Sequence, residues 1–301
     1  MRPVARRAKP DWTQADPVAI ERSLQRALAR PSGGWYVLGW ARRLTRKPQA
    51  FVVDGRHLVV WRTNTGALRA GSDVCPHMGA SLAGGEMRDD CIVCPWHGLA
   101  LGPRAHGGWR PLQAHDDGVL VWARLGPDEE ATAAPILSKR PDRYVDAVVR
   151  VDARCEPRDV IANRLDPWHG THLHPYAFSQ LEVTSADDDE LRLDVTYRVA
   201  GRIGVPVRAT FVSPEPRTVV MTITDGDYAG SVVETHATPL GPGRTAIIEA
   251  TLATSSRAGF RHVQRFSAPV RAVLGWAARR LWVDDAAYAE RLYALRSGAV
   301  R

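Results

Sequence analysis

Hydrophobic residues change their spacing along the chain, and these changes divide it into segments. Between residues 18 and 29 they recur at helical intervals, and Pro31 followed by Gly33 and Gly34 ends that pattern. From Trp35 onward the hydrophobic runs are short and rich in β-branched and aromatic residues, which is typical of strands. Residues 1–34 therefore predict a helical extension that precedes a β-rich region.

The β-rich region ends in a linker. Its strand-like runs lie at 35–40, 50–53, 57–62 and 118–125. The pair Asp54-Gly55 and the segment Asn64–Gly66 supply turn signals between runs. Residues 126–135 are polar and rich in small side chains, the composition of a linker between domains. Residues 35–130 therefore predict a small antiparallel β-domain.

Residues 136–301 predict a second domain of the α+β class. The segment 144–153 has the pattern of a strand, and the chain then becomes helical around 159–174. Several alternating strand-like runs follow between 181 and 253, and a long helical pattern covers about 268–295. This order predicts an antiparallel sheet that packs against helices.

Composition narrows the class of protein. A chain of 301 residues, 45% of them hydrophobic, is long enough for two ordinary domains with real cores. No stretch approaches 18 consecutive apolar residues, and the arginine-rich start leads into polar residues, so we expect neither a membrane span nor a secretory signal. The four cysteines, three of them clustered, argue against a disulfide scaffold. We expect a cytoplasmic protein.

The net charge of +7 does not predict nucleic-acid binding. The basic residues are scattered among aspartates and glutamates, without a lysine-rich block or an interleaved row of aromatic residues. An acidic protein partner is a better explanation of the positive charge.

Three cysteines and two histidines lie between Val74 and Gly98. Cys75 and His77 are separated by one residue, Cys94 and His97 by two, and sixteen residues lie between the pairs. Two thiolates and two imidazoles suit either a tetrahedral zinc ion or a [2Fe-2S] cluster in which histidines replace two cysteines. The Cys-X-His spacing is too short for the usual zinc finger, and each pair mixes the two ligand types. Both features favour the cluster.

This pattern resembles the Rieske iron-sulfur family at all four ligand positions. The resemblance implies a [2Fe-2S] cluster on Cys75, His77, Cys94 and His97. Respiratory and photosynthetic members carry an extra cysteine in each loop and a serine that donates to a cluster sulfur, at positions where this chain has Ala80, Trp96 and Leu99. Fewer hydrogen bonds to the sulfurs imply a lower reduction potential, which suits a cluster that is reduced by a ferredoxin. We interpret Cys91 and Cys155 as ordinary buried or half-buried thiols.

A second polar cluster lies in the next domain, where Asn163, Asp166, His169, His172 and His174 fall within twelve residues. One interpretation is purely structural: Asp166 caps a helix and the histidines lie on its polar face. The order of the two motifs, however, resembles Rieske non-haem iron oxygenases, which carry an Asn or Glu, an Asp and two His after the linker. The resemblance implies that His169 and His174 bind Fe(II) with coordination positions left open for O2.

Helix geometry leaves an alternative for the second histidine. On a regular helix His169 neighbours His172, whereas His174 reaches it only at a π-bulge or a frayed end. Pro175 disfavours helical geometry at His174, which makes a frayed end there plausible. We therefore choose His174, and His172 is the alternative.

The resemblance also implies an Asp ligand far along the chain. The pair Asp284-Asp285 offers two candidates, and the family pattern favours Asp285. A structural interpretation makes Asp284 the N-cap of the last helix, with Asp285 in its first turn.

Asp166 and Asn163 are candidate catalytic residues. In the family, the matching Asp links an iron-ligand histidine to a Rieske histidine of the neighbouring subunit. Carried over, Asp166 joins His169 to His97 of the next chain in a homotrimer.

These motifs imply an all-β Rieske domain at 35–130 and an α+β, helix-grip-like catalytic domain with an antiparallel sheet at 136–301. The expected function is that of a terminal oxygenase, a monooxygenase rather than a dioxygenase, that hydroxylates, demethylates or otherwise oxidises an apolar organic substrate with Fe(II) and O2. The chain has no flavin or nicotinamide fingerprint, so electrons from NAD(P)H would arrive through an external ferredoxin or reductase. The alternatives are a Rieske electron carrier and an apolar-ligand-binding protein without mononuclear iron.

Overall fold

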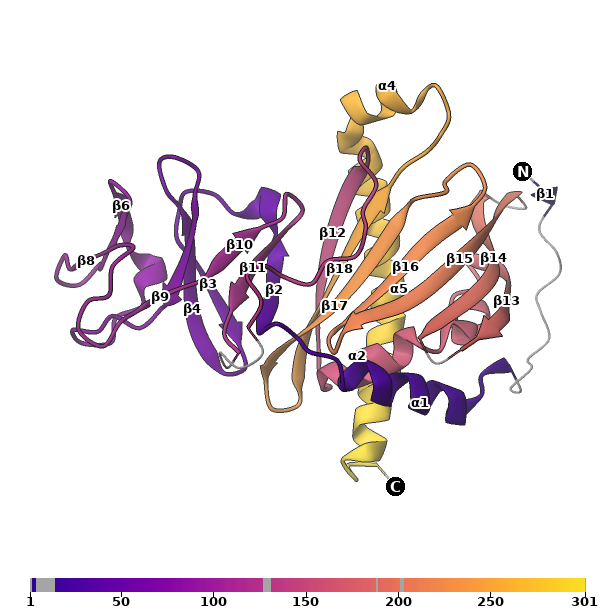
Figure 1. Cartoon of the computed structure of the whole chain (residues 1–301), viewed down its shortest axis with the longest axis horizontal. Coiled ribbons are helices and arrows are strands. Elements are labelled where there is room, and N and C mark those ends of the chain that lie inside the picture. The colour runs from indigo at the N-terminus through magenta and orange to yellow at the C-terminus, as the bar shows by residue number, and fades with distance from the viewer. Residues whose placement is uncertain (1, 4–13, 127–130, 188, 201–202, 301) are drawn as a thin grey trace. The chain divides into compact units, whose positions relative to one another are not determined.

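The computed structural model describes residues 2–3, 14–126, 131–187, 189–200 and 203–300, which form two compact units (Figure 1). The β unit comprises residues 32–135 and 238–242. The helix–sheet unit comprises the chain before residue 32, residues 136–237 and the chain from 243 onward. The N-terminal helix, expected to be an extension of its own, belongs to the helix–sheet unit because Leu24 and Ala27 are part of its core.

The β unit consists of three small antiparallel sheets, with strand orders β10-β11-β2, β3-β4-β5-β9 and β6-β7-β8. The strands are β2 (Trp35–Trp40), β3 (Gln49–Val53), β4 (Arg56–Arg62), β5 (Leu68–Ser72), β6 (Glu86–Arg88), β7 (Cys91–Val93), β8 (Ala100–Leu101), β9 (Pro111–Leu112), β10 (Ala114–Asp116) and β11 (Leu120–Arg124). Short 3₁₀ turns lie at Ala41–Arg43 and Leu82–Gly84. The predicted turn at Asp54-Gly55 is confirmed, since both residues have the positive φ, 49° and 70°, of a two-residue hairpin.

Strand β4 is buried on both faces and separates two hydrophobic cores. Leu58 and Val60 face one core, and Val59 and Trp61 face the other. This alternation follows from the two-residue period of a strand. The second core also contains Cys75 and Cys94, so the two cysteine loops rest on a packed base of large hydrophobic side chains, Trp61, Leu82, Ile92, Leu101 and Trp109.

The helix–sheet unit is built on one antiparallel sheet with the order β12-β18-β17-β16-β15-β14-β13, to which β1 adds by pairing with β15. Its strands are β1 (Arg2–Pro3), β12 (Val145–Ala153), β13 (Phe178–Ala186), β14 (Glu190–Ala200), β15 (Ile203–Glu215), β16 (Thr218–Asp225), β17 (Val232–Gly241) and β18 (Arg244–Ala253). Its helices are α1 (Pro17–Leu28), α2 (Pro157–Arg164), the 3₁₀ turn η5 (Pro167–His169), α3 (Gly170–Leu173), α4 (Phe260–Arg265) and α5 (Ser267–Arg296). The expected α+β class with an antiparallel sheet is confirmed.

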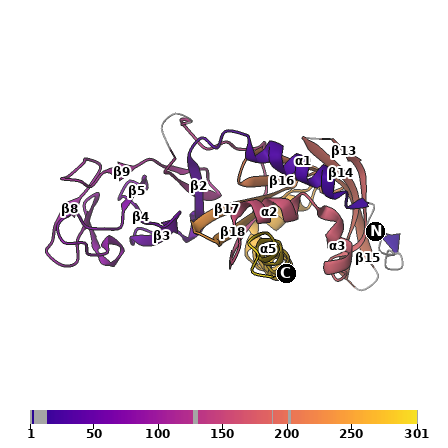
Figure 2. The same cartoon turned by 90° about the horizontal axis from the view of Figure 1, so that it is seen from below.

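Helix α5 lies along one face of this sheet with α2 beside it (Figures 1 and 2). Trp282, Ala286 and Ala289 recur at intervals of four and three residues, so they form one buried face of α5. They share a core with the inward side chains of the strands, among them Leu193, Phe211 and Met221. This packing holds the middle of α5 against the elements that carry the histidine motif.

The two long predicted helices are confirmed, with one correction. The helix predicted at about 268–295 is α5, Ser267–Arg296, and Asp16 caps the predicted N-terminal helix by accepting from the N–H groups of Val18 and Ala19. Asp284 and Asp285 lie in the middle of α5, so the helix-capping interpretation of this pair is wrong. Within the described chain, no helix is both long and apolar enough to cross a lipid bilayer.

Candidate metal centres

Two loops of the β unit share one backbone arrangement. In each loop the cysteine N–H donates to the carbonyl of the residue five positions later, at 2.9 Å for Cys75 and 2.8 Å for Cys94. The N–H groups of Gly79 and Gly98 donate back to the carbonyls of these cysteines. Both glycines have a positive φ, 80° and 74°, which other residues rarely adopt. Each loop therefore turns tightly around its cysteine.

The side chains of these two loops separate by chemistry. Cys75 and Cys94 are 2% and 3% exposed and interact through their side chains, whereas His77 and His97 are exposed, with ring centroids 4.8 Å apart. A buried sulfur pair beside an exposed imidazole pair fits a [2Fe-2S] cluster with sulfur ligands on one iron and histidines on the other. We call these four residues the cluster ligands. Cys91 is half-buried and Cys155 is buried, and both are free thiols.

The electrostatics around Cys94 favour a metal-binding thiolate. Burial raises the pKa of its thiol, but hydrogen bonds from the backbone N–H groups of Trp96 and His97, together with the Cys75 side chain, outweigh that effect and lower the pKa. Because the thiolate is the form that binds metal, the loop prepares Cys94 for ligation.

The second site depends on a break in the helical segment. Helix α2 ends at Arg164, η5 covers Pro167–His169, and α3 ends at Leu173. His174 has φ −119° and ψ 52°, outside helical geometry, as Pro175 predicts. Asp166 lies at the N-cap position of η5 with Pro167 after it, as the structural interpretation expects, but its side chain makes no capping hydrogen bond. The break brings the rings of His169 and His174 to a centroid distance of 5.6 Å.

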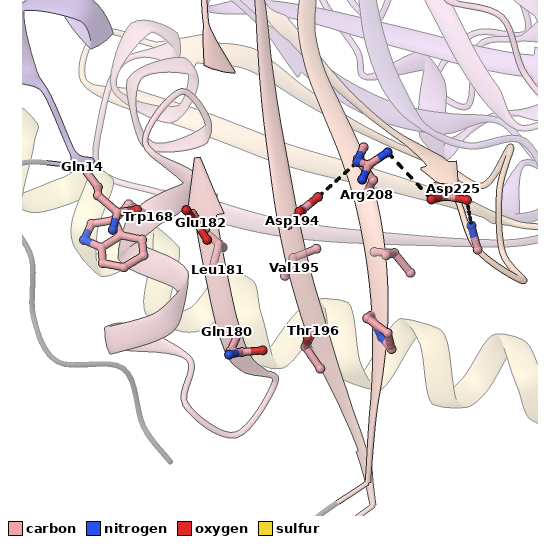
Figure 3. Close-up of a pocket in the computed structure, with 13 residues that line it drawn as sticks. Gln14, Trp168, Gln180, Leu181, Glu182, Asp194, Val195, Thr196, Arg208 and Asp225 are labelled. Atoms are coloured by element: carbon pink, nitrogen blue, oxygen red, sulfur yellow. Dashed lines mark hydrogen bonds and ion pairs between the residues drawn. The ribbon is translucent and has the colours of Figure 1, made fainter. Parts of the chain in front are cut away.

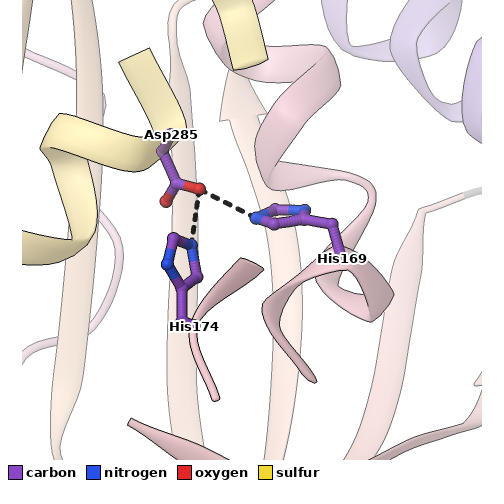
Figure 4. A group of neighbouring side chains, drawn as sticks. All are labelled: His169, His174 and Asp285. Carbon is purple, nitrogen blue, oxygen red and sulfur yellow. Dashed lines mark hydrogen bonds and ion pairs between the residues drawn. The ribbon is translucent and has the colours of Figure 1, made fainter. Parts of the chain in front are cut away.

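His169, His174 and Asp285 converge from η5, the end of α3 and the middle of α5, and we call them the triad (Figure 4). The Nε2 atoms of the two histidines lie 2.9 Å and 2.8 Å from the same oxygen, Oδ1 of Asp285. The three potential ligand atoms lie within 4.8 Å of one another. His172 points elsewhere and packs its ring against Trp168 at 5.5 Å.

The surroundings of the two imidazoles fit a metal ion. Nδ1 of His169 contacts the Asp166 carbonyl oxygen, and Nδ1 of His174 lies 3.4 Å from Oδ2 of Asp284. A neutral imidazole has one N–H, so a hydrogen that serves an acceptor at Nδ1 leaves a lone pair at Nε2. Two such lone pairs and a carboxylate oxygen would then face one another, and a divalent cation between them removes the repulsion. Two His and one carboxylate are also the ligand set of non-haem Fe(II) sites.

Ionisation within the triad has a defined direction. Burial raises the pKa of Asp285, but the hydrogen bonds with His169 and His174 outweigh it and hold the pKa well below its usual range. Burial lowers the pKa of His169, but the hydrogen bond and charge of Asp285 and the charge of Asp166 raise it above its ordinary value. Without metal the site therefore favours the ionised form of Asp285 and the charged form of His169 more than water does, and a metal ion must compete with a proton at His169.

Neighbouring side chains orient the triad. The Tyr176 hydroxyl donates to Oδ2 of Asp284 at 2.7 Å, and the carboxylate thus held lies beside Nδ1 of His174. The buried Asn163 side chain donates from Nδ2 to Oδ1 of Asp285 at 3.4 Å. Such contacts determine ring orientation and tautomer in metal sites.

The two carboxylate oxygens of Asp166, also next to the triad, differ in their hydrogen bonding. The Tyr288 hydroxyl donates to Oδ2 of Asp166 at 3.2 Å, and the Tyr288 ring stacks on His169 at a centroid distance of 5.2 Å. Oδ1 of Asp166 is buried and has no hydrogen-bond partner among the residues that the structure describes. This oxygen is therefore an unsatisfied buried acceptor beside the triad.

Sequence reasoning did not identify Tyr176 and Tyr288. Tyr288 follows Asp285 by three residues, so helical periodicity places both on one face of α5. This spacing could have identified Tyr288 as a neighbour of the site. Tyr176 follows His174 by two residues in an irregular segment, where spacing alone predicts no contact.

A groove of about 630 Å³ lies on strands β13, β14 and β15, and its lining contains none of the triad residues (Figure 3). Arg208 crosses it and pairs with Asp194 at 3.2 Å and Asp225 at 3.8 Å. All three side chains are at least half exposed. This charged surface does not match the pocket expected for an apolar substrate.

Two family models match the chain. Residues 34–119 match the Rieske [2Fe-2S] domain, and residues 126–300, more than half of the chain, match the domain of unknown function DUF5914. Among curated proteins, the chain is 32% identical over 166 residues to the oxygenase component of chloroacetanilide N-alkylformylase from Rhizorhabdus wittichii, a match that covers 48% of this chain and 47% of that protein. It is 27% identical over 173 residues to a vanillate O-demethylase oxygenase subunit from Pseudomonas sp.. That match covers 52% of this chain and 48% of the demethylase subunit. The chain thus matches about half the length of these relatives.

The fold also resembles that of solved structures over most of the chain. The crystal structure of dicamba monooxygenase bound to dicamba superimposes with a TM-score of 0.67 at 17% identity, over 90% of this chain and 91% of that one. At this identity the likeness establishes the fold. The chain therefore belongs to the DUF5914 family, and its Rieske [2Fe-2S] domain and two-domain fold are those of the oxygenase components of Rieske-type non-haem iron oxygenases.

Proposed function

We propose that this chain is the oxygenase component of a multicomponent monooxygenase. When bound, a Rieske cluster on the cluster ligands and Fe(II) on the triad would supply electron transfer and O2 activation, so that an apolar organic substrate is hydroxylated, demethylated or otherwise oxidised. The electrons would come from NAD(P)H through an external ferredoxin or reductase. The observation that carries this proposal is the convergence of two Nε2 atoms on the Asp285 carboxylate in a chain that also has a Rieske domain.

The names of the relatives support the reaction class. One is a vanillate O-demethylase oxygenase subunit, and others are 3-ketosteroid-9-alpha-monooxygenase oxygenase components from Rhodococcus rhodochrous. Demethylation and monooxygenation are therefore the reactions that we infer for this chain. The residues of the chain would hold the two histidines and the carboxylate in place. The Asp166 carbonyl oxygen and the Tyr176 hydroxyl oxygen accept the Nδ1 protons of His169 and His174, and the Tyr176 hydroxyl in turn donates to Asp284. Asn163 restrains the Asp285 carboxylate.

We also infer that Asp166 connects the two metal centres of neighbouring chains in a homotrimer. Its Oδ1 lacks a donor within the described chain, while its backbone carbonyl contacts His169 of the triad. An imidazole N–H from His97 of an adjacent copy would satisfy Oδ1. The same carboxylate would then lie between the two histidines and orient both.

Iron content tests the proposed function. After iron-replete anaerobic expression, the purified chain should contain about three irons, two in the cluster and one on the triad. His174→Ala should reduce this to about two with an unchanged cluster spectrum, and the matched variant His172→Ala should retain about three. Two irons in the wild type would point to an electron carrier or a ligand-binding protein. If only the His172→Ala variant loses iron, the iron ligand is His172 and not His174.

A further inference from the structure

An arginine enters the interior of the helix–sheet unit close to the triad. Arg164 is the last residue of α2 and follows Asn163, which donates to Asp285. Its guanidinium carbon lies 5.3 Å from the centroid of the Phe211 ring on β15 and 5.8 Å from that of Trp282 on α5. Phe211 and Trp282 are 5% and 0% exposed, so the cation lies between the sheet and the last helix.

This guanidinium has aromatic neighbours but no anionic partner. Its Nε atom is buried and makes no hydrogen bond within the part of the chain that the structure describes, and Arg164 forms no ion pair there. Aromatic faces attract a cation, but they leave its N–H groups without acceptors. Arg164 as a whole is half-buried, so its guanidinium is partly shielded from water and would be stabilised by an anion that reaches it.

Glu249 on β18 is the carboxyl group within electrostatic reach, and it is already engaged. It is 6% exposed and accepts a hydrogen bond of 2.7 Å from Nε1 of Trp282. Burial raises its pKa above the ordinary value, and the charge of Arg164 offsets only part of this. The charge of Asp285 raises the pKa further, so Glu249 lies in the field of both the arginine and the triad. Glu249 therefore resists ionisation, and it forms no ion pair with Arg164 among the residues that the structure describes.

We propose that Arg164 binds the carboxylate of an organic ligand that enters this interior, while Phe211 and Trp282 border the apolar part of the ligand. This inference rests on the proposed function, because the ligand would be the substrate of the triad. The planar fork of a guanidinium matches a carboxylate with two parallel hydrogen bonds. One guanidinium balances one negative charge, whereas a phosphate would bring a second charge into a largely apolar core. The substrate class is therefore an apolar carboxylate.

Calorimetric titration with benzoate and benzamide tests this inference, because the two probes share ring and shape but only benzoate is charged. The measurement uses the full chain loaded with iron and cluster, anaerobically and without reductant, so no turnover occurs. Benzoate should bind at least about tenfold more tightly than benzamide, the effect of a charge-assisted hydrogen bond. Arg164→Met should remove this preference. Arg208→Met, the matched change at an exposed arginine, should keep it. Equal binding of the two probes, or a preference that survives in Arg164→Met, overturns the proposal.

A second variant protects the test against misfolding. Arg164→Lys retains the charge and most of the volume but loses the fork, so it should bind benzoate several-fold more weakly than the wild type and still prefer it to benzamide. If Arg164→Met does not fold, an undiminished affinity for benzoate in the Lys variant overturns the proposal. A protein that binds benzoate through Arg164 but consumes no O2 would refute only the proposed function. An active oxygenase without an Arg164-dependent preference would refute only this inference.

Discussion

Asp284 and Asp285 are neighbours in sequence but have different surroundings. Successive residues on a helix point about 100° apart, so only one of the two can face the histidines directly. Asp285 is 3% exposed and its Oδ1 lies near both Nε2 atoms. The Asp284 side chain is 42% exposed and lies beside Nδ1 of His174 and the Tyr176 hydroxyl. The first position suits a metal ligand, and the second suits a residue that orients a ligand.

Asparagine substitutions at these two positions should therefore have unequal effects. Asp285→Asn removes the anionic ligand, so the chain should lose its mononuclear iron. Asp284→Asn keeps the site but weakens the orientation of His174, so Fe(II) affinity should fall about 10- to 100-fold. Anaerobic Fe(II) titration of the metal-depleted triad measures both, with the cluster absorbance as the internal control. If iron still binds to Asp285→Asn but not to Asp284→Asn, then Asp284 is the metal ligand and Asp285 is not.

Sequence could propose the site residues, but it could not supply their surroundings. His169, His174 and Asp285 were candidates because the chain resembles a family that has metal ligands at these places. Tyr288 and Arg164 were not candidates, because their importance depends on which helix faces meet across the core. Such contacts depend on tertiary packing, which a single sequence does not display.

At the scale of elements, β17 carries a buried ion pair that the sequence did not predict. Arg140 donates from Nε and Nη2 to the two carboxylate oxygens of Glu234, both at 2.6 Å. The side chains are 12% and 2% exposed. Burial raises the pKa of Glu234, but hydrogen bonds with Arg140 and His236 outweigh it and lower the pKa. The pair ties the segment before β12 to the middle of the sheet.

Arg140→Met should destabilise the protein by about 3–5 kcal/mol at neutral pH, because it leaves a buried carboxylate unpaired. The folded-state pKa of Glu234 is depressed, so the stabilisation from this pair is present above the ordinary glutamate pKa and lost as pH falls through the folded value. The gap between wild type and variant should therefore narrow in denaturant titrations only as the pH falls below about 4.5, the ordinary value from which the pKa of Glu234 is lowered. Arg150→Met, which breaks an exposed pair with Asp152, should change stability by less than about 1 kcal/mol. A gap that widens toward acid would contradict the role given to Glu234.

The long last helix could be predicted from the sequence, whereas the shortest strands of the β unit could not. Helix α5 begins and ends within about one residue of the predicted bounds. Strands β8 and β9 have two residues each and were not predicted, since their conformation depends on the strands beside them. The segment expected to be helical around 159–174 is divided into α2, η5 and α3. This division brings the two histidines together, and only the prolines hinted at it.

At the scale of the whole molecule, the question is how two metal centres on one chain would work together. Oδ1 of Asp166 is relevant to this question, because this carboxylate oxygen next to the triad has no hydrogen-bond donor within the described residues. If the donor is a Rieske histidine of a neighbouring copy, electrons cross between chains. The cluster and the triad that cooperate then belong to different polypeptides.

Co-expression of two inactive variants tests this directly. A Cys94→Ser chain lacks the cluster and a His174→Ala chain lacks mononuclear iron, so neither should oxidise substrate alone. If chains assemble at random in equal amounts, an intact cluster faces an intact triad at about one junction in four over all the trimers that form. Single-turnover product formation should therefore recover to about a quarter of the wild-type yield.

The control is the double variant Cys94→Ser/His174→Ala co-expressed with a Cys94→Ser chain. This mixture has no intact cluster and should stay inactive. Adding Asp166→Asn to the Cys94→Ser chain, which supplies the triad, should abolish the recovery while its iron content stays unchanged. Mixed assemblies that form but give no product would show that electrons do not pass between chains.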